Sequence, residues 1–245
     1  LGYDELTVPT TVVGIIADGR SVLHATAGSM VEIALAQTPF YAEMGGQDSD
    51  TGIIRANGFD LEVLDVQAPV PGLIVHKVQL DGDLAVGDKV SAQVDPAARF
   101  EACKAHTATH VLHAALRELV GPSATQAGSY NKPGYLRFDF NYTEQLTPEQ
   151  LEEIALVTNQ AVDQHFEVHT IETSLDKAKE MGAMALFGEN YGSEVRVVEM
   201  GGPFSIELCG GTHVANTAEI GPVSVLGESS VGSGARRIEA YSGLD

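Results

Sequence analysis

The amino-acid sequence predicts an α+β protein, in which a small N-terminal β-barrel precedes a two-layer α/β domain with an antiparallel sheet. Three observations predict this architecture. Short apolar segments separated by turn dipeptides fill the first part of the chain, an Asp-Pro pair then opens a long amphipathic segment, and strand and helix patterns alternate after it. We therefore expect a domain boundary near residue 95, with a barrel domain over residues 1–95 and a second domain over residues 96–245.

The barrel domain is predicted from short strands joined by tight turns, with no convincing helix among them. Asp18-Gly19 and Asn57-Gly58 are dipeptides that favour two-residue hairpin turns. Many short strands at close spacing indicate a small β-barrel. The expected strands cover residues 10–17, 22–27, 31–36, 52–56, 61–66, 73–78 and 89–94.

The second domain is predicted to open with a long helix. Asp95 is a good N-cap and Pro96 suits the first helical position, so the helix begins there; it runs to Val120, and Gly121-Pro122 end it. The elements expected after it are a hairpin with strands at residues 129–130 and 135–140, a helix opening at residues 147–148, a strand near residues 167–172, a short helix from residue 174 and several C-terminal strands.

Composition excludes a membrane-embedded or disulfide-based protein. Because 44% of the residues are hydrophobic and 20% are charged, the chain has the balance of a folded soluble protein. No apolar run approaches the roughly 18 residues that cross a bilayer, and the N-terminus lacks a signal-peptide pattern. The two cysteines, Cys103 and Cys209, lie near histidines. A reducing cytoplasm and a metal-binding use of cysteine therefore fit best.

The charge balance is the opposite of what a nucleic-acid-binding protein usually carries. The chain has 14 basic and 34 acidic residues, a formal net charge of -20. Such a chain should bind bulk RNA poorly, because phosphate contacts need clustered Lys and Arg. If it meets RNA, we expect most of the affinity to come from elsewhere in a larger protein, of which this chain is expected to be a fragment.

Two short motifs together predict a metal site. His106 and His110 are four residues apart on the predicted helix, so both imidazoles lie on one face and can reach one ion. Cys209 and His213 are also four apart, and the two glycines between them allow a tight turn after a strand.

Each motif alone has an ordinary explanation, as a helix that happens to carry histidines or as a turn with an incidental cysteine. The two together supply three imidazoles and one thiolate, the ligand types that zinc prefers. We therefore predict one zinc ion. Cys103 and His113 share the histidine stripe, but Cys103 lacks a partner motif of its own, and neither is expected to be a ligand.

Several motifs resemble the editing domain of alanyl-tRNA synthetases, which also occurs in free-standing editing proteins. The resemblance covers essentially the whole chain and keeps the family's motif order. The upstream stretch is similar to the family's signature in the β-barrel that precedes the editing domain. The segments that carry the resemblance are TPFYAEMGGQDSDTG (residues 38–52), HTATHVLHAAL (106–116), QAGSY (from 126), RFDF (from 137), ELCGGTH (from 207) and GARRIEA (234–240).

The resemblance implies hydrolysis of the ester that links serine or glycine to the terminal adenosine of alanine tRNA. An activation pocket for alanine excludes glycine poorly and rejects an added hydroxyl only modestly, so a second site must clear these errors. The implied zinc cofactor would serve this reaction. The implied partners are the acceptor end of alanine tRNA and the remaining domains of a synthetase that attaches alanine to tRNA, with no membrane. Its ATP-dependent domain would precede residue 1.

The resemblance also assigns a role to Gln126, which matches the family position that faces the substrate and is expected to hydrogen-bond the serine hydroxyl. Four protein ligands are typical of structural zinc, whereas catalytic zinc keeps an open position. Zinc could become five-coordinate, release one ligand, or only position the ester. A zinc-activated water is the simplest account, with Glu207 or Asp139 as the candidate general base, although carboxylates on strands are more often structural.

A glycine-rich loop and several arginines are the candidates for contact with tRNA. The loop has the alternative of being a plain hairpin tip, and the arginines that of being solvated surface residues. Residues 236 and 237 alternate faces of a strand, so at most one of them points toward the site. The six candidates are Gly45, Gly46, Gln47, Arg99, Arg117 and Arg237.

Two other functions fit parts of the pattern. One is a zinc-stabilised module that binds tRNA without hydrolysing it, which normal tRNA binding without deacylation would distinguish. The other is a zinc peptidase, which is disfavoured because the helix reads HTATH and lacks the glutamate of the HExxH motif.

Overall fold

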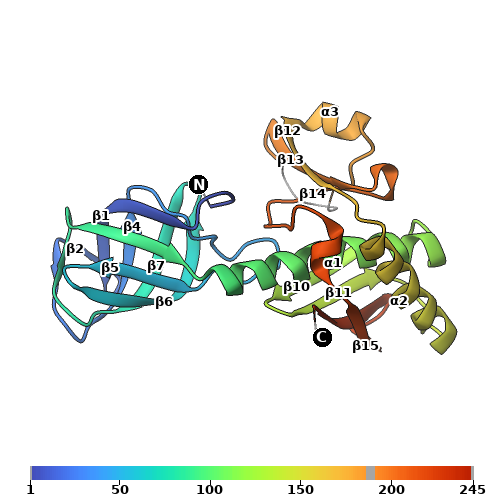
Figure 1. Cartoon of the computed structure of the whole chain (residues 1–245), viewed down its shortest axis with the longest axis horizontal. Coiled ribbons are helices and arrows are strands. Elements are labelled where there is room, and N and C mark those ends of the chain that lie inside the picture. Colours follow the sequence, from blue (N-terminus) through green and yellow to red (C-terminus); the bar gives the residue numbers. More distant parts are fainter. Residues whose placement is uncertain (1, 186–190, 244–245) are drawn as a thin grey trace. The chain divides into compact units, whose positions relative to one another are not determined.

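The computed structural model describes residues 2–185 and 191–243 and has the mixed, strand-rich α+β architecture that the sequence predicts (Figure 1). The chain divides into two compact units. The first contains Leu1–Met44 and Asp48–Arg99, and the second contains Gly45–Gln47 and Phe100–Asp245. The long stretch of the second unit thus begins after Arg99, and three residues of the loop between the early strands belong to it.

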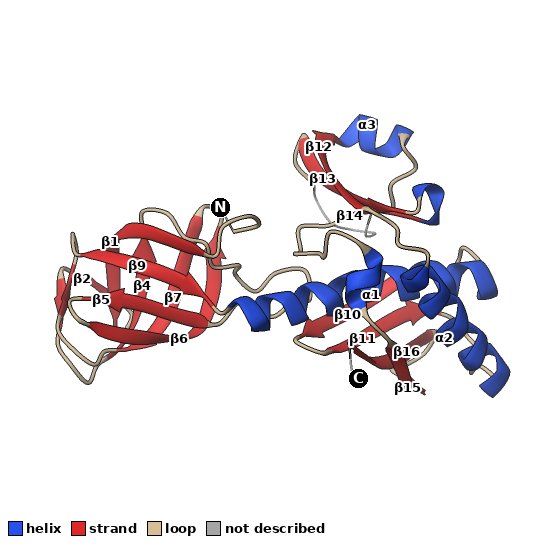
Figure 2. Ribbon diagram, viewed as in Figure 1, coloured by secondary structure: helices blue, strands red, loops and turns tan. Residues whose placement is uncertain are grey.

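The first unit is a closed antiparallel barrel (Figure 2). Six strands follow one another around it in the order β1-β4-β7-β6-β5-β9, and β9 pairs back onto β1. The short β2 extends β1, and β3 pairs with β8 apart from the main sheet. The strands are β1 (Thr7–Ala17), β2 (Arg20–Val22), β3 (His24–Ala25), β4 (Met30–Leu35), β5 (Gly52–Ala56), β6 (Phe59–Val70), β7 (Leu73–Gln79), β8 (Leu84–Ala85) and β9 (Lys89–Val94).

Two of the barrel hairpins have the turns predicted from their dipeptides. Asp18 and Gly19 have φ values of 50° and 74°, and Asn57 and Gly58 have 49° and 85°. Positive φ at both central residues gives a turn whose twist matches that of the flanking strands. These turns join β1 to β2 and β5 to β6, and within the described residues before Asp95 there is no helix.

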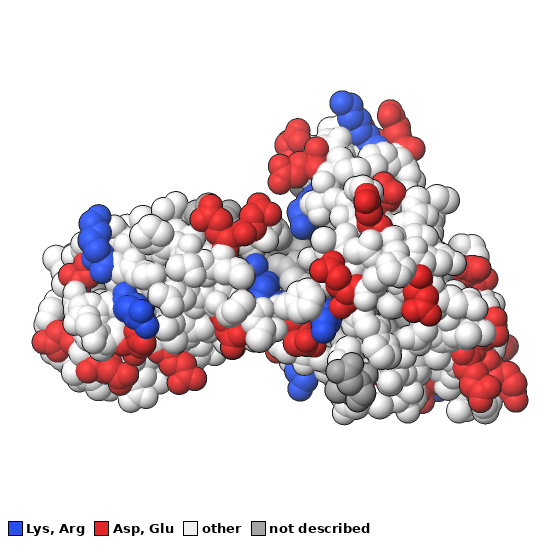
Figure 3. Space-filling view, viewed as in Figure 1, with Lys and Arg blue, Asp and Glu red and all other residues white. Residues whose placement is uncertain are grey.

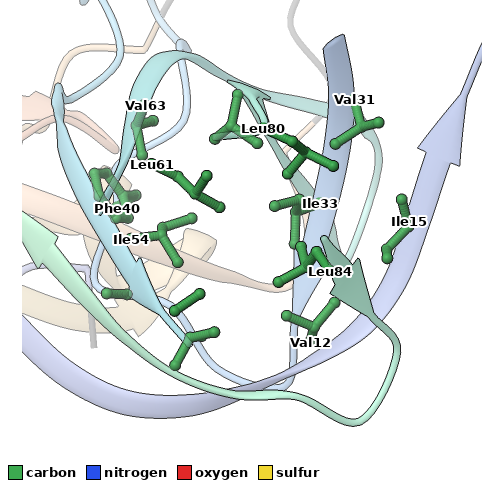
Figure 4. Packing of buried hydrophobic residues seen from close by; sticks show 14 of the residues in the cluster. Val12, Ile15, Val31, Ile33, Phe40, Ile54, Leu61, Val63, Leu80 and Leu84 are labelled. Carbon is green, nitrogen blue, oxygen red and sulfur yellow. The ribbon is translucent and has the colours of Figure 1, made fainter. Parts of the chain in front are cut away.

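The barrel encloses one apolar core built from alternate residues of its strands (Figure 4). On β4, for example, Val31 and Ile33 are buried, while Glu32 between them is exposed. Burying one such side chain contributes about 1.5–3 kcal/mol, so this core is the main stabilising term of the unit. The labelled residues are Val12, Ile15, Val31, Ile33, Phe40, Ile54, Leu61, Val63, Leu80 and Leu84.

The long helix α1 (Pro96–Val120) has the bounds that the sequence predicts. The side chain of Asp95 accepts hydrogen bonds from Ala97 N at 3.0 Å and Ala98 N at 3.1 Å, which satisfies two free N–H groups of the first turn. Gly121 follows the helix with φ +108°, a conformation that favours glycine. The helix therefore begins and ends for the reasons visible in the sequence.

The remainder of the second unit contains two separate antiparallel sheets rather than the single sheet that the sequence suggested. One has the strand order β10-β11-β16-β15 and the other β12-β13-β14. The elements are β10 (Gln126–Lys132), β11 (Tyr135–Asn141), α2 (Pro148–Asp163), β12 (Val168–Ser174), α3 (Leu175–Glu180), β13 (Glu194–Met200), η1 (Gly202–Phe204), β14 (Ser205–Leu208), η2 (Thr217–Ile220), β15 (Val223–Ser230) and β16 (Ala235–Ser242).

Helix α1 is buried on both sides because it packs between these two sheets (Figure 1). Leu112 and Leu116 pack with Phe138 of β11 in one core. Ala108 and Val111 pack in a second core that includes residues of β13. The helix face that carries the histidines is consequently enclosed by protein.

No helix of the described residues is long and apolar enough to cross a membrane.

Candidate metal centre

Four side chains from α1 and from the turn after β14 converge in the second unit. They are His106, His110, Cys209 and His213, and their potential ligand atoms all lie within 4.8 Å of one another. The thiol sulfur Sγ of Cys209 lies 3.4 Å from Nε2 of His106 and 3.4 Å from Nε2 of His213. Only 5% of His106 and 4% of His110 is exposed, whereas Cys209 and His213 are partly exposed.

Helical spacing and a tight turn produce this convergence. The rings of His106 and His110 lie 5.3 Å apart, centroid to centroid, one turn from each other on α1. Gly211 lets the turn after β14 approach the helix, because a Cβ at this position would lie 2.0 Å from Cε1 of His106. Arg196 stabilises the turn, because its Nη1 donates to the carbonyls of Cys209 at 2.9 Å and Gly211 at 2.8 Å.

Glu207 contacts two histidines of α1. Its carboxylate oxygens lie 2.9 Å from Nδ1 of His110 and 2.5 Å from Nδ1 of His113. Burial alone would raise the pKa of Glu207, but the charges and hydrogen bonds of His110 and His113 outweigh burial and hold that pKa well below its usual range. Nε2 of His113 lies 3.2 Å from the carbonyl of Ala124, so both of its ring nitrogens face oxygen atoms and His113 lies outside the cluster.

This placement changes the role predicted for Glu207. A general base needs a carboxylate oxygen that can take a proton from water, and both oxygens of Glu207 face imidazole nitrogens. Glu207 is 8% exposed. We conclude that Glu207 orients His113 by a hydrogen bond and lies within ion-pair distance of His110.

Thr107 holds His213 in the same way. Its hydroxyl Oγ1 donates to the carbonyl of Cys103 at 2.8 Å and accepts from the N–H of Val214 at 3.1 Å. Since the single hydroxyl proton is used by Cys103, the contact of 3.0 Å with Nδ1 of His213 requires His213 to donate. Nε2 of His213 then carries the lone pair that faces the thiol of Cys209.

Gln47 contacts the third histidine. Its Oε1 lies 2.7 Å from Nδ1 of His106, and its side chain is fully buried. Its Nε2 donates to the hydroxyl of Thr212 at 2.7 Å. Each imidazole of the cluster therefore has Nδ1 beside an oxygen of another residue, which leaves Nε2 available to a metal.

The electrostatics of the cluster favour ligand-competent forms of Cys209 and His213 and a protonated form of His110. Burial alone would raise the pKa of the Cys209 thiol, but the three surrounding imidazoles outweigh it and hold that pKa well below its usual range. Burial lowers the pKa of His213 to about 3 despite the nearby thiolate. Burial would also lower the pKa of His110, but the charges of Glu207 and Cys209 raise it to about 10. A metal must consequently displace a proton from His110.

Gln126 and Asp139, the other two residues predicted to act on the substrate, lie on β10 and β11. Nε2 of Gln126 donates to the hydroxyl of Ser129 at 3.1 Å, and Gln126 is half-buried. Asp139 accepts two hydrogen bonds from the guanidinium of Arg237, at 2.7 and 3.0 Å. Asp139 and Arg237 therefore form a bidentate ion pair. In this pair the carboxylate is not free to act as a base, and the guanidinium is not free to contact a phosphate.

The arginines on α1 differ in their surroundings. Arg99 is 6% exposed, and its guanidinium donates to Asp50 at 2.8 Å and to the carbonyl of Pro39 at 3.0 Å within the first unit. This is a buried structural ion pair, not a surface that phosphate reaches. Arg117 is half-buried, and its contact with tRNA stays a prediction.

Gly45 and Gly46 shape the loop that delivers Gln47. Both have positive φ, 59° and 83°, and a Cβ on Gly46 would lie 2.3 Å from the carbonyl oxygen of Ser129. The carbonyl of Gly46 accepts from the N–H of Asn131 at 2.7 Å, which fastens the loop to β10. The sequence singled out this loop but not its contact with His106, because no local pattern links Gln47 to a residue 59 positions later.

Comparisons with known proteins agree with this architecture. Residues 195–239 match the family model for the threonyl and alanyl tRNA synthetase second additional domain, and residues 1–98 match the model for class II (A) tRNA synthetases. The alanine–tRNA ligase of Cutibacterium acnes is 69% identical over 245 residues, which is 100% of this chain. The chain belongs to the alanyl-tRNA synthetase family. The corresponding ligases of Corynebacterium diphtheriae and Nocardia farcinica are 62% and 57% identical over the same length.

The chain spans 28% of the length of each of these family members. The match to the second additional domain includes Glu207, Cys209 and His213, whereas His106 and His110 lie in the segment between the two family-model matches. The cluster thus joins a segment that one family model describes to a part of α1 that neither describes.

Proposed function

We propose that this chain is the editing region of an alanine–tRNA ligase and hydrolyses the ester of alanine tRNA mischarged with serine or glycine at a zinc site. The observation that carries the proposal is the convergence of three imidazoles and one thiol, two of the four residues being buried, in a member of this family. We further propose that the whole ligase attaches alanine to tRNA with ATP, and that domains outside this chain carry out that reaction. A cytoplasmic location, inferred from the use of cysteine, belongs to the same proposal.

The donor set fits zinc. The cluster offers three imidazole nitrogens and one thiolate. Zinc binds these ligand types, whereas harder cations prefer oxygen ligands. The partners of the Nδ1 atoms orient the rings, an arrangement typical of histidines that bind a metal. A zinc ion bound here would supply Lewis acidity toward the ester or a water molecule.

The other residues predicted to act on the substrate have separate proposed roles. Gln126 is the proposed contact of the serine hydroxyl, because alanine is smaller than serine and only a polar contact can tell them apart. Its amide already donates to Ser129, so it is positioned before a substrate binds. Glu207 contacts His113, and Asp139 is paired with Arg237. We therefore propose that neither carboxylate acts as the base that activates water.

The acidic surface shapes the interaction with tRNA. Asp and Glu side chains are spread over the face seen in Figure 3, with a few Lys and Arg between them. Because the chain has a formal net charge of -20, long-range attraction to phosphates is weak, and we propose that the other domains of the ligase hold the body of the tRNA. The editing region would then contact only the acceptor end, with Arg117 as a candidate phosphate contact.

A matched pair of cysteine variants tests the proposal. Cys209→Ala removes a proposed ligand, and Cys103→Ala removes a buried cysteine that lies outside the cluster. With seryl-tRNA specific for alanine as substrate, Cys209→Ala should lose zinc and deacylation, whereas Cys103→Ala should keep both. Retention of zinc and deacylation by Cys209→Ala would reject the proposed site.

A second candidate function rests on the number of protein ligands, which leaves no open coordination position on a four-coordinate zinc ion. Four protein ligands are typical of structural zinc, so the region would then bind tRNA without hydrolysing its ester. Zinc-loaded wild-type protein that binds seryl-tRNA but leaves the ester intact would favour this function over the first.

A further inference from the structure

We propose that Gln47 is a positioning residue of the metal centre, whose amide oxygen fixes the tautomer and the ring orientation of His106. The inference rests on the proposed zinc site. It assigns the glycine-rich loop, predicted from the sequence to touch tRNA, to the support of a metal ligand instead. Gln47 belongs by its contacts to the second unit, although its place in the sequence is among the barrel strands.

The hydrogen bonds of Gln47 determine which way its amide points. The backbone N–H of Thr212 can only donate, and it lies 3.0 Å from the amide, so the atom that it faces is Oε1. The other amide atom, Nε2, donates to the hydroxyl of Thr212 at 2.7 Å. Both contacts agree, and Oε1 is therefore the atom that lies 2.7 Å from Nδ1 of His106.

The tautomer of His106 follows from this orientation. Because Oε1 of Gln47 only accepts, Nδ1 of His106 must carry the proton. In a neutral imidazole Nε2 then holds the lone pair, and Nε2 is the nitrogen that lies 3.4 Å from the thiol of Cys209. A buried glutamine thus selects the ligand atom of His106.

No water molecule replaces this contact easily, because the surroundings are closed. Gln47 is fully buried and Thr212 is 3% exposed. A Cβ on Gly211 would lie 2.9 Å from Oε1 of Gln47 and 2.1 Å from Nδ1 of His106. The glycine therefore keeps open the space in which the amide and the imidazole meet.

The position of Gln47 in the sequence makes the metal centre depend on residues before α1. Thr107 and Glu207, which lie beside Nδ1 of the other two imidazoles, belong to the long stretch of the second unit. Gln47 alone comes from the loop that precedes β5. A family member that keeps both ligand motifs but lacks this glutamine is consequently expected to bind zinc more weakly.

Zinc affinity of two variants of the full chain tests the proposal. In Gln47→Met a side chain of similar length lacks the acceptor, and we expect zinc binding to weaken by about 10–100-fold, the usual cost of removing an outer partner of a metal ligand. In Gln47→Glu the acceptor remains, so we expect zinc affinity at or above that of the wild type. Affinity is measured by competition with a chromophoric zinc chelator, and the control is Gln37→Met at an exposed glutamine.

Unchanged affinity in Gln47→Met, or an equal loss in Gln47→Met and Gln47→Glu, would overturn the proposal, since the second result indicates packing alone. A measurement on the wild type needs no variant: long-range ¹H–¹⁵N spectra of the zinc-loaded protein should show His106 protonated at Nδ1, and protonation at Nε2 would overturn it. These readouts do not involve hydrolysis. If the zinc results are as expected but the protein does not deacylate seryl-tRNA specific for alanine, the proposed function is rejected. The role of Gln47 in orienting His106 then still stands.

Discussion

Gly211→Ala is expected to break the metal centre with the addition of one methyl group. The new Cβ would lie 2.0 Å from Cε1 and 2.1 Å from Nδ1 of His106. The ring would have to retreat by about 1.4 Å to reach the 3.4 Å of ordinary contact, whereas metal–ligand distances tolerate only about 0.2 Å. Since φ of Gly211 lies outside the left-handed region, the effect is steric rather than a backbone effect.

The consequence is the loss of His106 as a ligand. We expect zinc affinity to fall by at least about 100-fold, the upper end of the loss seen when only an outer partner is removed. Affinity is measured by chelator competition, and the cobalt-substituted protein reports the ligand set through its visible absorption. The matched control is Gly227→Ala, because a Cβ on Gly227 meets no atom within 4 Å. Wild-type affinity and an unchanged cobalt spectrum in Gly211→Ala would refute the reasoning.

Three further outcomes follow from the same geometry. Glu207→Gln leaves an amide group facing a ring N–H in a buried site, so the free energy of unfolding should fall by about 3–5 kcal/mol, the range for a buried pair that loses one partner; urea unfolding of the zinc-free protein checks this. Because the pKa of His110 is raised to about 10 in the absence of metal, zinc should displace about one proton at neutral pH, and zinc affinity should rise with pH until about pH 10; calorimetry in two buffers of different ionisation enthalpy counts the proton. Gln126→Ala should narrow the ratio of seryl to alanyl deacylation by no more than about tenfold at constant zinc content, because one neutral hydrogen bond contributes about 0.5–1.5 kcal/mol; an unchanged ratio would remove Gln126 from the mechanism.

Local chemistry explains why much of the fold could be predicted from the sequence. Asp95 and Gly121 mark the two ends of α1 because a side-chain cap and a left-handed residue act within one turn of the helix. Asp18-Gly19 specified its hairpin for the same reason. The start of β10 was missed, since residues 126–128 are Gln-Ala-Gly, which have no strand-like alternation, and this part of the strand is held by pairing with β11.

Long-range contacts explain what the sequence could not show at the site. The convergence of the four cluster residues was expected because each pair of ligands is only four residues apart. The partners of the side chains were not visible in the same way. Glu207 was predicted to be a possible base, but its hydrogen-bond partner His113 lies 94 residues earlier in the chain. Arg99 was predicted to be a surface cation, and its buried ion pair with Asp50 spans 49 residues.

The most direct test of the account is the rate of ester hydrolysis as a function of bound zinc. Zinc-free protein is titrated with zinc, and the single-turnover rate on seryl-tRNA specific for alanine is measured at each occupancy. We predict that the rate rises in proportion to bound zinc, levels off at one ion per cluster, and exceeds the rate on the alanyl form. Full hydrolysis by the zinc-free protein, or no hydrolysis at full occupancy, would contradict the account.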